Sequence, residues 1–440
     1  LPGGVEGVIP RYSLPEMAAI WSEAHKLEVW KEVEVLAVEA WVSNGVAPLE
    51  AAEAARAAPE VDAVAWKERE EVTNHDVAAF VDVLAASVTA GGEWIHYGLT
   101  SSDVLDTAQG VIMRDAADLL LRRVAELFAV VERRAFEFRD TPMIGRTHGI
   151  WAEPTSFGLK LANWAFEIAR DHARLRRARE AVAVGKVSGA VGTYAHTPPA
   201  IESYVCERLG LAIEPASTQI THRDRHAELL STLALVGSSL ERFATEIRHL
   251  QRSEVGEVRE SFGRGQKGSS SMPHKRNPIA SENVTGLARL LRAYAGAGLE
   301  DVALWHERDI SHSSVERIAL PDACLALDFA LVRMTKLIDH LVVDTDRMAS
   351  NLESTQGLVF SQAVLLDLIE RQGLTREDAY RIVQRNAMTA WDEGRPLQEL
   401  LAADADVTLS AEELADCFST TRALRNTGVV FTRLEEAQLG

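Results

Sequence analysis

The stretch from Gly263 to Pro278, GRGQKGSSSMPHKRNP, carries the side chains best suited to chemistry in this 440-residue chain. Its glycines expose backbone N–H groups, its serines supply hydroxyls, and Lys275 and Asn277 supply a positive charge and a neutral donor. Together these groups suit an anionic substrate whose carboxylate gains charge during a reaction. A Gly/Ser-rich run is also typical of a flexible linker, but a linker does not need the mixture of side chains in MPHKRNP.

Histidine is the natural proton donor near neutral pH, and two of the thirteen histidines stand out. His148 lies in the motif GRTHG, on a glycine-flanked break between two predicted long helices, where a side chain can reach a cleft. A purely structural role for His148 is the alternative. His75 lies at the start of a predicted helix beside Asn74 and Asp76, and either neighbour can simply cap that helix.

Two further groups of polar residues suit the binding of an anion. Arg308, Ser313 and Arg317 place two guanidinium groups near a hydroxyl, a set that can clamp a phosphate or form ion pairs with neighbouring carboxylates. Thr100 and Ser101 lie in a polar turn, where they can cap the next helix or donate hydrogen bonds to a carboxylate. Both interpretations stay open for each group.

Composition excludes several classes of partner. The formal net charge of −19 disfavours nucleic acid and an anionic membrane, and no run of eighteen apolar residues or signal peptide is present. The three cysteines are far apart and lack metal-type spacing, as expected in a reducing compartment such as the cytoplasm. The chain also lacks a Walker loop, a Rossmann fingerprint and spacings typical of metal ligands, so we expect no cofactor and no metal.

Helices must position these residues, because apolar side chains recur at three- and four-residue steps over long stretches. The best strand candidate, at 185–194, is a short glycine-broken hairpin or a loop. Helices this long cannot bury their apolar stripes on a small globule, which indicates a bundle built by several subunits. The predicted long helices span about 103–140, 154–183, 226–255, 278–298 and 315–341.

The stretch at 263–278 resembles the signature loop of the aspartase/fumarase superfamily, whose members release fumarate by β-elimination. His274 and Arg276 make it most similar to the adenylosuccinate lyase family, and the similarity extends from Arg11-Tyr12 to the C-terminal helices. The resemblance implies an all-α fold of three domains: an N-terminal helical domain (1–100), a central bundle (101–347) and a C-terminal helical domain (348–440). It also implies a homotetramer whose active sites are shared between subunits.

The same resemblance assigns roles to residues of this chain. His148 is the expected general acid and Ser269 the general base, with Ser270 as its nearest competitor. Lys275 and Asn277 would hold the developing carboxylate charge. His75 would orient the substrate, and Glu282 would pair with the catalytic histidine. The remaining expected contacts with the substrate come from Arg11, Tyr12, Asn74, Asp76, Thr100, Ser101, Gln219, Ser270, Asn283, Arg308, Ser313 and Arg317.

One of these positions departs from the family, which often has arginine where this chain has Asn74, so one contact with the substrate is in doubt. The expected reactions split adenylosuccinate into AMP and fumarate, and the succinyl-carboxamide ribotide of purine synthesis into its carboxamide ribotide and fumarate. The alternatives are another superfamily member, such as a 3-carboxymuconate cycloisomerase, and a non-catalytic, crystallin-like helical protein. Argininosuccinate lyases and fumarases usually differ at the position of His274.

Overall fold

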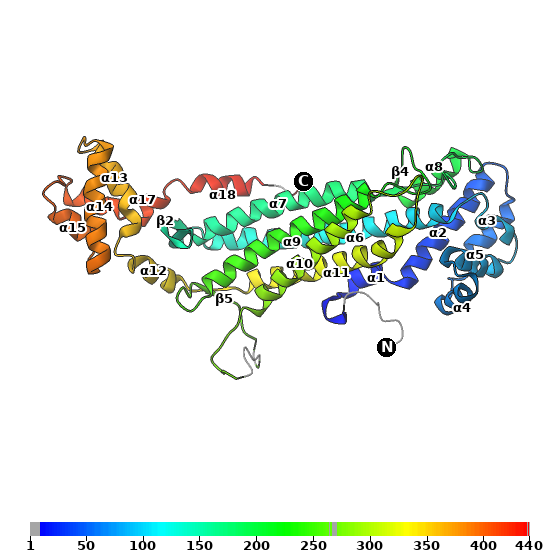
Figure 1. Cartoon of the computed structure of the whole chain (residues 1–440), viewed down its shortest axis with the longest axis horizontal. Helices are drawn as coiled ribbons and strands as arrows, with labels where there is room; N and C mark the ends of the chain where they lie inside the picture. Colours follow the sequence, from blue (N-terminus) through cyan, green and yellow to red (C-terminus); the bar gives the residue numbers. More distant parts are fainter. Residues whose placement is uncertain (1–8, 264, 266–270, 438, 440) are drawn as a thin grey trace.

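The computed structural model describes residues 9–263, 265, 271–437 and 439 of the chain. These residues form an elongated, mainly helical molecule with a bundle of long helices in the middle and shorter helices at each end (Figure 1). The predicted all-α class is confirmed. Within the described residues, no helix is long and apolar enough to cross a membrane.

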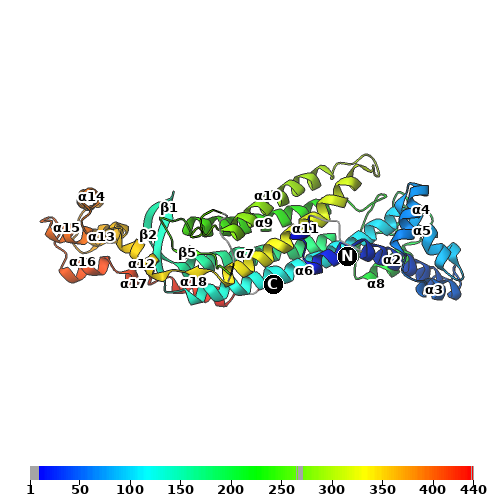
Figure 2. The ribbon, with the colours of Figure 1, turned by 90° about the horizontal axis from the view of Figure 1, so that it is seen from below.

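Five long helices run side by side along the molecule and form the central bundle (Figures 1 and 2). Their apolar faces meet in one continuous core that includes Leu120, Trp164, Phe243 and Leu327. Each such side chain contributes roughly 1.5–3 kcal/mol when it is fully buried. The five predicted long helices are confirmed to within a few residues at each end, as α6 (Ser101–Glu137), α7 (Phe157–Val182), α9 (Asp224–Leu250), α10 (Ile279–Glu300) and α11 (Ser311–Asp339).

Shorter helices cover the end of the bundle where α6 begins. They share a second apolar core, which contains Trp30, Phe80 and Val205, because α2 packs against both α6 and α8. Ser22 starts α2 by accepting a hydrogen bond from the N–H of His25. The elements here are α2 (Glu23–Ser43), α3 (Leu49–Arg56), α4 (Ala63–Thr73), α5 (Asp76–Ser87), η2 (Gly92–Trp94) and α8 (Pro199–Leu209). The two elements that precede them, η1 (Pro10–Tyr12) and α1 (Pro15–Ile20), pack against α11 of the central bundle.

The opposite end carries a third apolar core that includes Leu368, Val383 and Leu401. After it the chain turns back, and the last helix packs against α7 through the buried ring of Phe431 (Figure 1). The elements here are α12 (Thr345–Glu353), η3 (Leu358–Phe360), α13 (Ser361–Glu370), α14 (Arg376–Glu393), α15 (Leu397–Ala403), α16 (Ala411–Cys417), α17 (Thr420–Leu424) and α18 (Gly428–Glu435).

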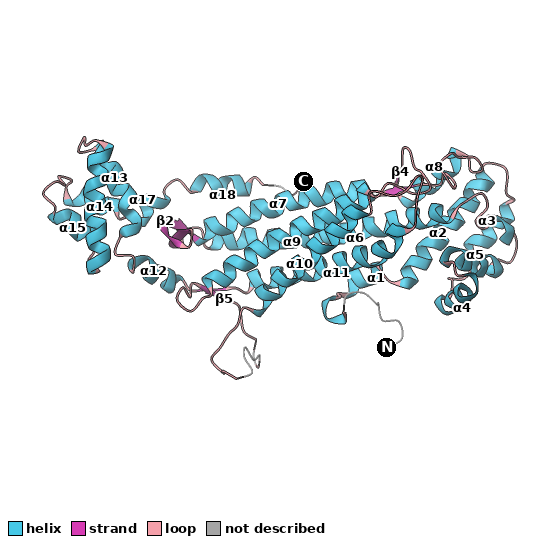
Figure 3. Cartoon of the chain, viewed as in Figure 1, coloured by secondary structure: helices cyan, strands magenta, loops and turns pink. Residues whose placement is uncertain are grey.

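Strands are short and occur in pairs (Figure 3). The segment 185–194 is a loop apart from its first residue, so the hairpin interpretation of it is wrong. A hairpin forms instead at β1–β2, between α6 and α7, and carries His148 at its tip. The pairs are β1 (Pro142–Thr147) with antiparallel β2 (Ile150–Ser156), β3 (Val184–Gly185) with parallel β4 (Ala212–Ile213), and β5 (Val258–Arg259) with antiparallel β6 (Val342–Val343).

Candidate active site

Arg308 joins three segments at the end of the bundle where α6 begins. Its Nη1 donates to Oε1 of Gln219 at 3.0 Å and lies 3.4 Å from Oγ of Ser102, while its Nε donates to Nε2 of His312 at 3.1 Å. A guanidinium held at three points in this way is oriented before any ligand arrives. The structure therefore brings the predicted residues Gln219 and Arg308 together, although they lie 89 positions apart in the sequence.

Arg317 lies one helical turn beyond Ser313 on α11. Its Nη2 forms an ion pair with Oδ2 of Asp76 at 2.5 Å, and its Nε lies 3.4 Å from Oγ of Ser313. Burial alone would raise the pKa of Asp76, but the hydrogen bond and charge of Arg317 lower it. We call Asp76, Gln219, Arg308, Ser313 and Arg317 the arginine cluster. Its two arginines and Ser313 line a cavity of about 280 Å³ between α2, α6 and α11.

A buried ionic network supports the arginine cluster from behind. The guanidinium of Arg223 donates to Asp106 at 2.6 Å and to Glu316 at 2.7 Å, and Glu316 lies 2.9 Å from Nδ1 of His312. Burial opposes ionisation of both carboxyls, yet these partners lower the pKa of Asp106 and of Glu316 to about 2. His312 in turn accepts the hydrogen bond of Arg308, so the network fixes that arginine.

A second buried ion pair organises the start of α6. Oδ2 of Asp103 accepts the backbone N–H of Thr100 at 2.8 Å, and Oδ1 accepts the N–H of Ser188 at 3.1 Å. Lys186 donates its Nζ to Oδ1 of Asp103 at 2.5 Å and to the carbonyl oxygen of Gln219 at 2.9 Å. The Asp103–Lys186 pair therefore holds the predicted residues Thr100 and Gln219 close to each other through its hydrogen bonds. Ser101 is the first residue of α6.

The signature loop is described only in part. Lys275 and Asn277 lie on its described second half, whereas Ser269 and Ser270 lie outside the described residues. Gln251 closes the base of the loop by accepting the N–H of Glu260 at 2.9 Å and donating to the carbonyl of Arg276 at 3.1 Å.

Glu260 also caps α10, the helix that follows the loop. Its carboxylate accepts the N–H groups of Ala280 and Ser281 at 3.0 and 2.8 Å and the hydroxyl of Ser281 at 2.7 Å. A negative charge at a helix N-terminus is stabilising because it satisfies N–H groups that have no partner within the helix. Gln251 and Glu260 therefore set where the loop enters and leaves the bundle.

The first turn of α10 faces the N-terminal segment. Nδ2 of Asn283 lies 3.4 Å from the hydroxyl of Tyr12, whose ring packs edge-on against Phe329 with centroids 5.1 Å apart. Glu282 and Arg11 are exposed to solvent. The structure thus joins two of the predicted residues, Tyr12 and Asn283, near the signature loop.

His148 is exposed at the tip of the β1–β2 hairpin. It and Gly149 both have positive φ, 54° and 78°, as expected for the two-residue turn that reverses a tight hairpin. Arg146 anchors the hairpin, because its two terminal nitrogens donate to the fully buried carboxylate of Glu257 at 2.9 and 2.7 Å. The predicted break between helices is confirmed, and its form is a β-hairpin.

His75 lies at the other end of the molecule. Its side chain is about half exposed and starts α5 by accepting the N–H of Ala78, directly after Asn74, which ends α4 with a positive φ. The two ends are joined by α6, whose 37 residues span about 55 Å at 1.5 Å per residue. Within one chain, therefore, His75 and His148 do not share a site.

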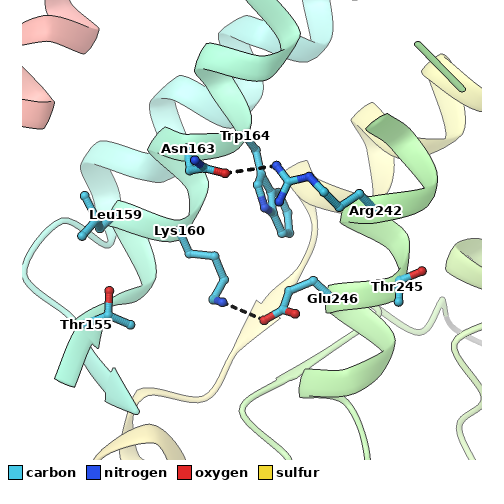
Figure 4. A pocket seen from close by; sticks show the side chains of 8 residues that line it. All are labelled: Thr155, Leu159, Lys160, Asn163, Trp164, Arg242, Thr245 and Glu246. Atoms are coloured by element: carbon cyan, nitrogen blue, oxygen red, sulfur yellow. Dashed lines mark hydrogen bonds and ion pairs between the residues drawn. The ribbon is translucent and has the colours of Figure 1, made fainter. Parts of the chain in front are cut away.

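A groove elsewhere on the bundle contains none of the predicted residues (Figure 4). It has a volume of about 470 Å³ and lies between α7 and α9. Its cations already have anionic partners, since Lys160 pairs with Glu246 at 2.7 Å and Arg242 pairs with Glu167. This groove is therefore a poorer site for an anionic ligand than the cavity at the arginine cluster.

The family profile described as "Lyase" matches residues 11–291, and the profile described as "Adenylosuccinate lyase C-terminus" matches residues 357–434. The chain is 50% identical over 429 residues to the adenylosuccinate lyase of Bacillus subtilis (strain 168), covering 97% of this chain and 99% of that protein. The chain belongs to the adenylosuccinate lyase family. Membership confirms the resemblance seen in the signature loop and makes the protein a carbon–nitrogen lyase.

Solved structures agree on the fold of this adenylosuccinate lyase family member. It superposes on a fumarate lyase from Mesorhizobium sp. BNC1 with a TM-score of 0.88 at 28% identity, over 97% of this chain and 99% of the other. A 3-carboxy-cis,cis-muconate lactonizing enzyme from Pseudomonas putida gives a TM-score of 0.87 at 29% identity, over 97% of each chain. The fold is thus common to a fumarate lyase and a lactonizing enzyme, whereas the 50% identity to an adenylosuccinate lyase distinguishes the family.

Several residues that position the site could not be recognised from the sequence. Arg223 and Glu260 are single charged residues within polar or helical stretches, where a solvated side chain is the ordinary expectation. Lys186 offers the one usable signal, because it is the only charged residue in the apolar stretch AVAVGKVSGAV. A lone charge in such a stretch indicates a buried ion pair, but the partner is found only in three dimensions.

Proposed function

We propose that this protein is an adenylosuccinate lyase, which splits adenylosuccinate into AMP and fumarate and the succinyl-carboxamide ribotide into its carboxamide ribotide and fumarate. The observation that carries the proposal is the arginine cluster. Two guanidinium groups and the hydroxyl of Ser313 line one cavity, a donor set that suits the phosphate of a nucleotide. The 50% identity to the Bacillus subtilis adenylosuccinate lyase supports the same assignment.

The proposed reaction is a β-elimination. Ser269 takes the proton from the succinyl carbon next to a carboxylate, and the electron pair of that C–H bond becomes the new C=C bond as the C–N bond breaks. The carboxylate gains charge on the way, and Lys275 and Asn277 stabilise it. His148 gives a proton to the leaving nitrogen. Serine is a weak base, so closure of the signature loop around the substrate must exclude water to make Ser269 competent.

The proposed catalytic groups come from different subunits. His148 and the arginine cluster lie at opposite ends of α6, a helix about 55 Å long, so a single chain is not expected to supply both to one substrate. A homotetramer that packs the bundles together brings the two ends of different copies to each other. Exposed apolar residues along the bundle, such as Leu235, Leu290 and Leu299, support such packing.

We further propose the three-part division at residues 100 and 347. The third core, which lies within 364–417, supports a separate C-terminal part, whereas the second core also takes residues such as Val104 and Val205 from the central segment. The proposed compartment is the cytoplasm. Cys206, Cys324 and Cys417 are free and buried, and burial raises the pKa of Cys206 and of Cys324 to about 12, so these thiols stay protonated. Free thiols of this kind fit a reducing compartment.

The test is a fumarate-release assay with adenylosuccinate as substrate. We expect turnover by the wild-type protein and its loss in Ser269→Ala, while binding of adenylosuccinate to the variant stays measurable by calorimetry. A second assay offers 3-carboxymuconate, because the fold is shared with a lactonizing enzyme for that compound. Turnover of 3-carboxymuconate alone would reassign the function, and turnover of neither substrate would favour a non-catalytic role.

A further inference from the structure

Lys26 lies on α2 at the wall of the cavity that the arginine cluster lines. Its ammonium group stands over the indole rings of Trp30 and Trp66, with Nζ 5.2 and 4.6 Å from the ring centroids. Such cation–π contacts stabilise a cation by about 0.5–2 kcal/mol without neutralising it. The rings therefore hold the ammonium of Lys26 in place and leave its charge available.

The other cations of the cavity differ in whether they already have an anionic partner. Arg223 pairs with Asp106 and Glu316, and Arg317 pairs with Asp76. Across the described ranges, no carboxylate oxygen lies within 4 Å of Nζ of Lys26 or of the guanidinium of Arg308. Two cations without a carboxylate partner thus face one cavity.

The charged form of Lys26 is destabilised when no anion is bound in the cavity. Burial and the nearby charge of Arg317 both lower the pKa of Lys26, although Glu23, Asp76 and Glu70 act in the opposite direction from beyond ion-pair distance. An incoming anion would offset both effects, because it supplies the missing countercharge in a site where water is scarce. The uncompensated positive charge of the cavity therefore favours the binding of an anionic group.

We propose that Lys26 is a further substrate-binding residue, which contacts the phosphate of the nucleotide together with Arg308, Ser313 and Arg317. The inference rests on the proposed function for the identity of the nucleotide. The phosphate is favoured over the succinyl carboxylates because two guanidinium groups and the hydroxyl of Ser313 line the same cavity, a donor set that matches the several oxygens of a phosphate.

The experiment compares Lys26→Met with the matched control Lys31→Met. Lys31 lies on the same helix, with a side chain that is 12% exposed, but it pairs with Glu60 at 2.7 Å and does not line this cavity. Steady-state kinetics are measured with adenylosuccinate and with its nucleoside form, which lacks the phosphate. We expect Lys26→Met to lower kcat/KM for adenylosuccinate by roughly 10- to 100-fold, mainly through KM, and to change it less than about twofold for the nucleoside.

Equal losses on both substrates, or no loss on adenylosuccinate, would overturn the proposal. Equal losses would mean that Lys26 contacts the succinyl group or only stabilises the fold. If Lys26→Met does not fold, Lys26→Gln replaces it, and thermal unfolding of each variant is recorded without ligand.

A binding measurement keeps this test separate from the proposed function. If the wild-type protein releases no fumarate from adenylosuccinate, the assigned reaction fails, but calorimetry with inorganic phosphate and with AMP still tests Lys26. We expect Lys26→Met to weaken phosphate binding at least tenfold and Lys31→Met to leave it unchanged. Equal affinities in both variants would exclude Lys26 from the phosphate site.

Discussion

Nζ of Lys186 lies 2.5 Å from Oδ1 of Asp103, and both side chains are fully buried. Lys186 uses its other two protons on the carbonyl oxygens of Gly189 and Gln219. Asp103 accepts the N–H of Thr100 in addition to those of the loop that follows Lys186. The pair is therefore the point at which two segments of the candidate site are fixed to each other.

We expect Asp103→Asn to damage both stability and activity. Asparagine keeps the size of the side chain but leaves the ammonium of Lys186 buried without a countercharge, which costs about 3–5 kcal/mol of unfolding free energy. Thr100 and Gln219 would shift relative to each other, and a displacement near 1 Å lowers kcat/KM by roughly 100-fold. Urea unfolding and fumarate release measure the two effects.

A loss of activity could follow from lower stability alone, so the control is Asp367→Asn. Asp367 is 1% exposed and pairs with Arg422 in the C-terminal helices, away from Thr100, Gln219 and the arginine cluster. We expect a comparable loss of stability with nearly unchanged kcat/KM at a temperature where both variants are folded. Equal losses of kcat/KM in the two variants would show that Asp103 has no special role in positioning.

The separation of His75 and His148 predicts complementation between inactive variants. Neither His75→Ala nor His148→Ala should be active alone, but co-expression of the two should restore activity. If each site takes residue 75 and residue 148 from different copies, random assembly leaves about a quarter of the sites intact. The measurement is kcat per site in the mixed, purified protein.

The matched control mixes His75→Ala with a chain that carries both substitutions. No assembly of these two chains contains an intact His75, so activity should stay at the background level. Failure of the first mixture to exceed this background, despite mixed oligomers in mass spectrometry, would contradict a site shared in this way.

Glu260 should matter to catalysis although it lies outside the signature loop. Glu260→Ala removes the carboxylate that caps α10, at an expected cost of about 1–2 kcal/mol in unfolding free energy. It also frees the base of the loop that carries Lys275 and Asn277, so we expect kcat to fall at least tenfold, because rate depends steeply on the position of such groups.

Ser410→Ala is the comparison for Glu260→Ala. Ser410 caps α16 in the C-terminal helices through the N–H of Glu413, so its loss should cost about 1 kcal/mol. Activity should not change in this variant. If Glu260→Ala loses a similar amount of stability but keeps the wild-type kcat, Glu260 does not help to position the loop.

Local patterns explain why the long helices were predictable. Apolar residues repeat at three- and four-residue steps along α6, α7 and α9, and this spacing alone defines a buried stripe. The β1–β2 hairpin was missed because its turn is His148-Gly149, a pair that lacks the usual Asn-Gly or Asp-Gly signal. The positive φ of His148 is imposed by the strands on either side and cannot be seen in the residue type.

Only those residues of the candidate site that belong to recognisable sequence motifs were predictable. His75, His148 and Arg308 were found through motif resemblance, but their placement at two ends of α6 depends on the length of the helix between them. The supporting ion pairs were not predictable, because Lys186 and Arg223 find partners 83 and 117 positions away, respectively. No local property of a charged residue reveals a partner at that separation.

Asp301 predicts how stability depends on pH. It ends α10 at a buried position, where burial and the nearby charge of Glu316 raise its pKa to about 6, and the helix C-terminus also disfavours a negative charge. In the unfolded chain an aspartate titrates near pH 3.9. The stabilisation provided by protonated Asp301 is therefore fully present below about pH 4 and is lost as the pH rises through about 6.

Asp301→Asn cannot ionise, so its Tm should exceed that of the wild-type protein at pH 8, and the difference should shrink at pH 5. The control Asp309→Asn should instead melt below the wild-type protein by a similar amount at both pH values. The side chain of Ser311 and the N–H groups of Trp305 and Ser311, the latter two at 2.7 and 2.9 Å, donate hydrogen bonds to Asp309 and lower its pKa to about 2. Its stabilisation is present above about pH 4 and is lost as the pH falls through about 2, so this variant should melt below the wild-type protein at pH 8. Thermal unfolding at both pH values measures the differences, and an equal gain for Asp301→Asn at pH 5 and pH 8 would show that the charge of Asp301 is not the cause.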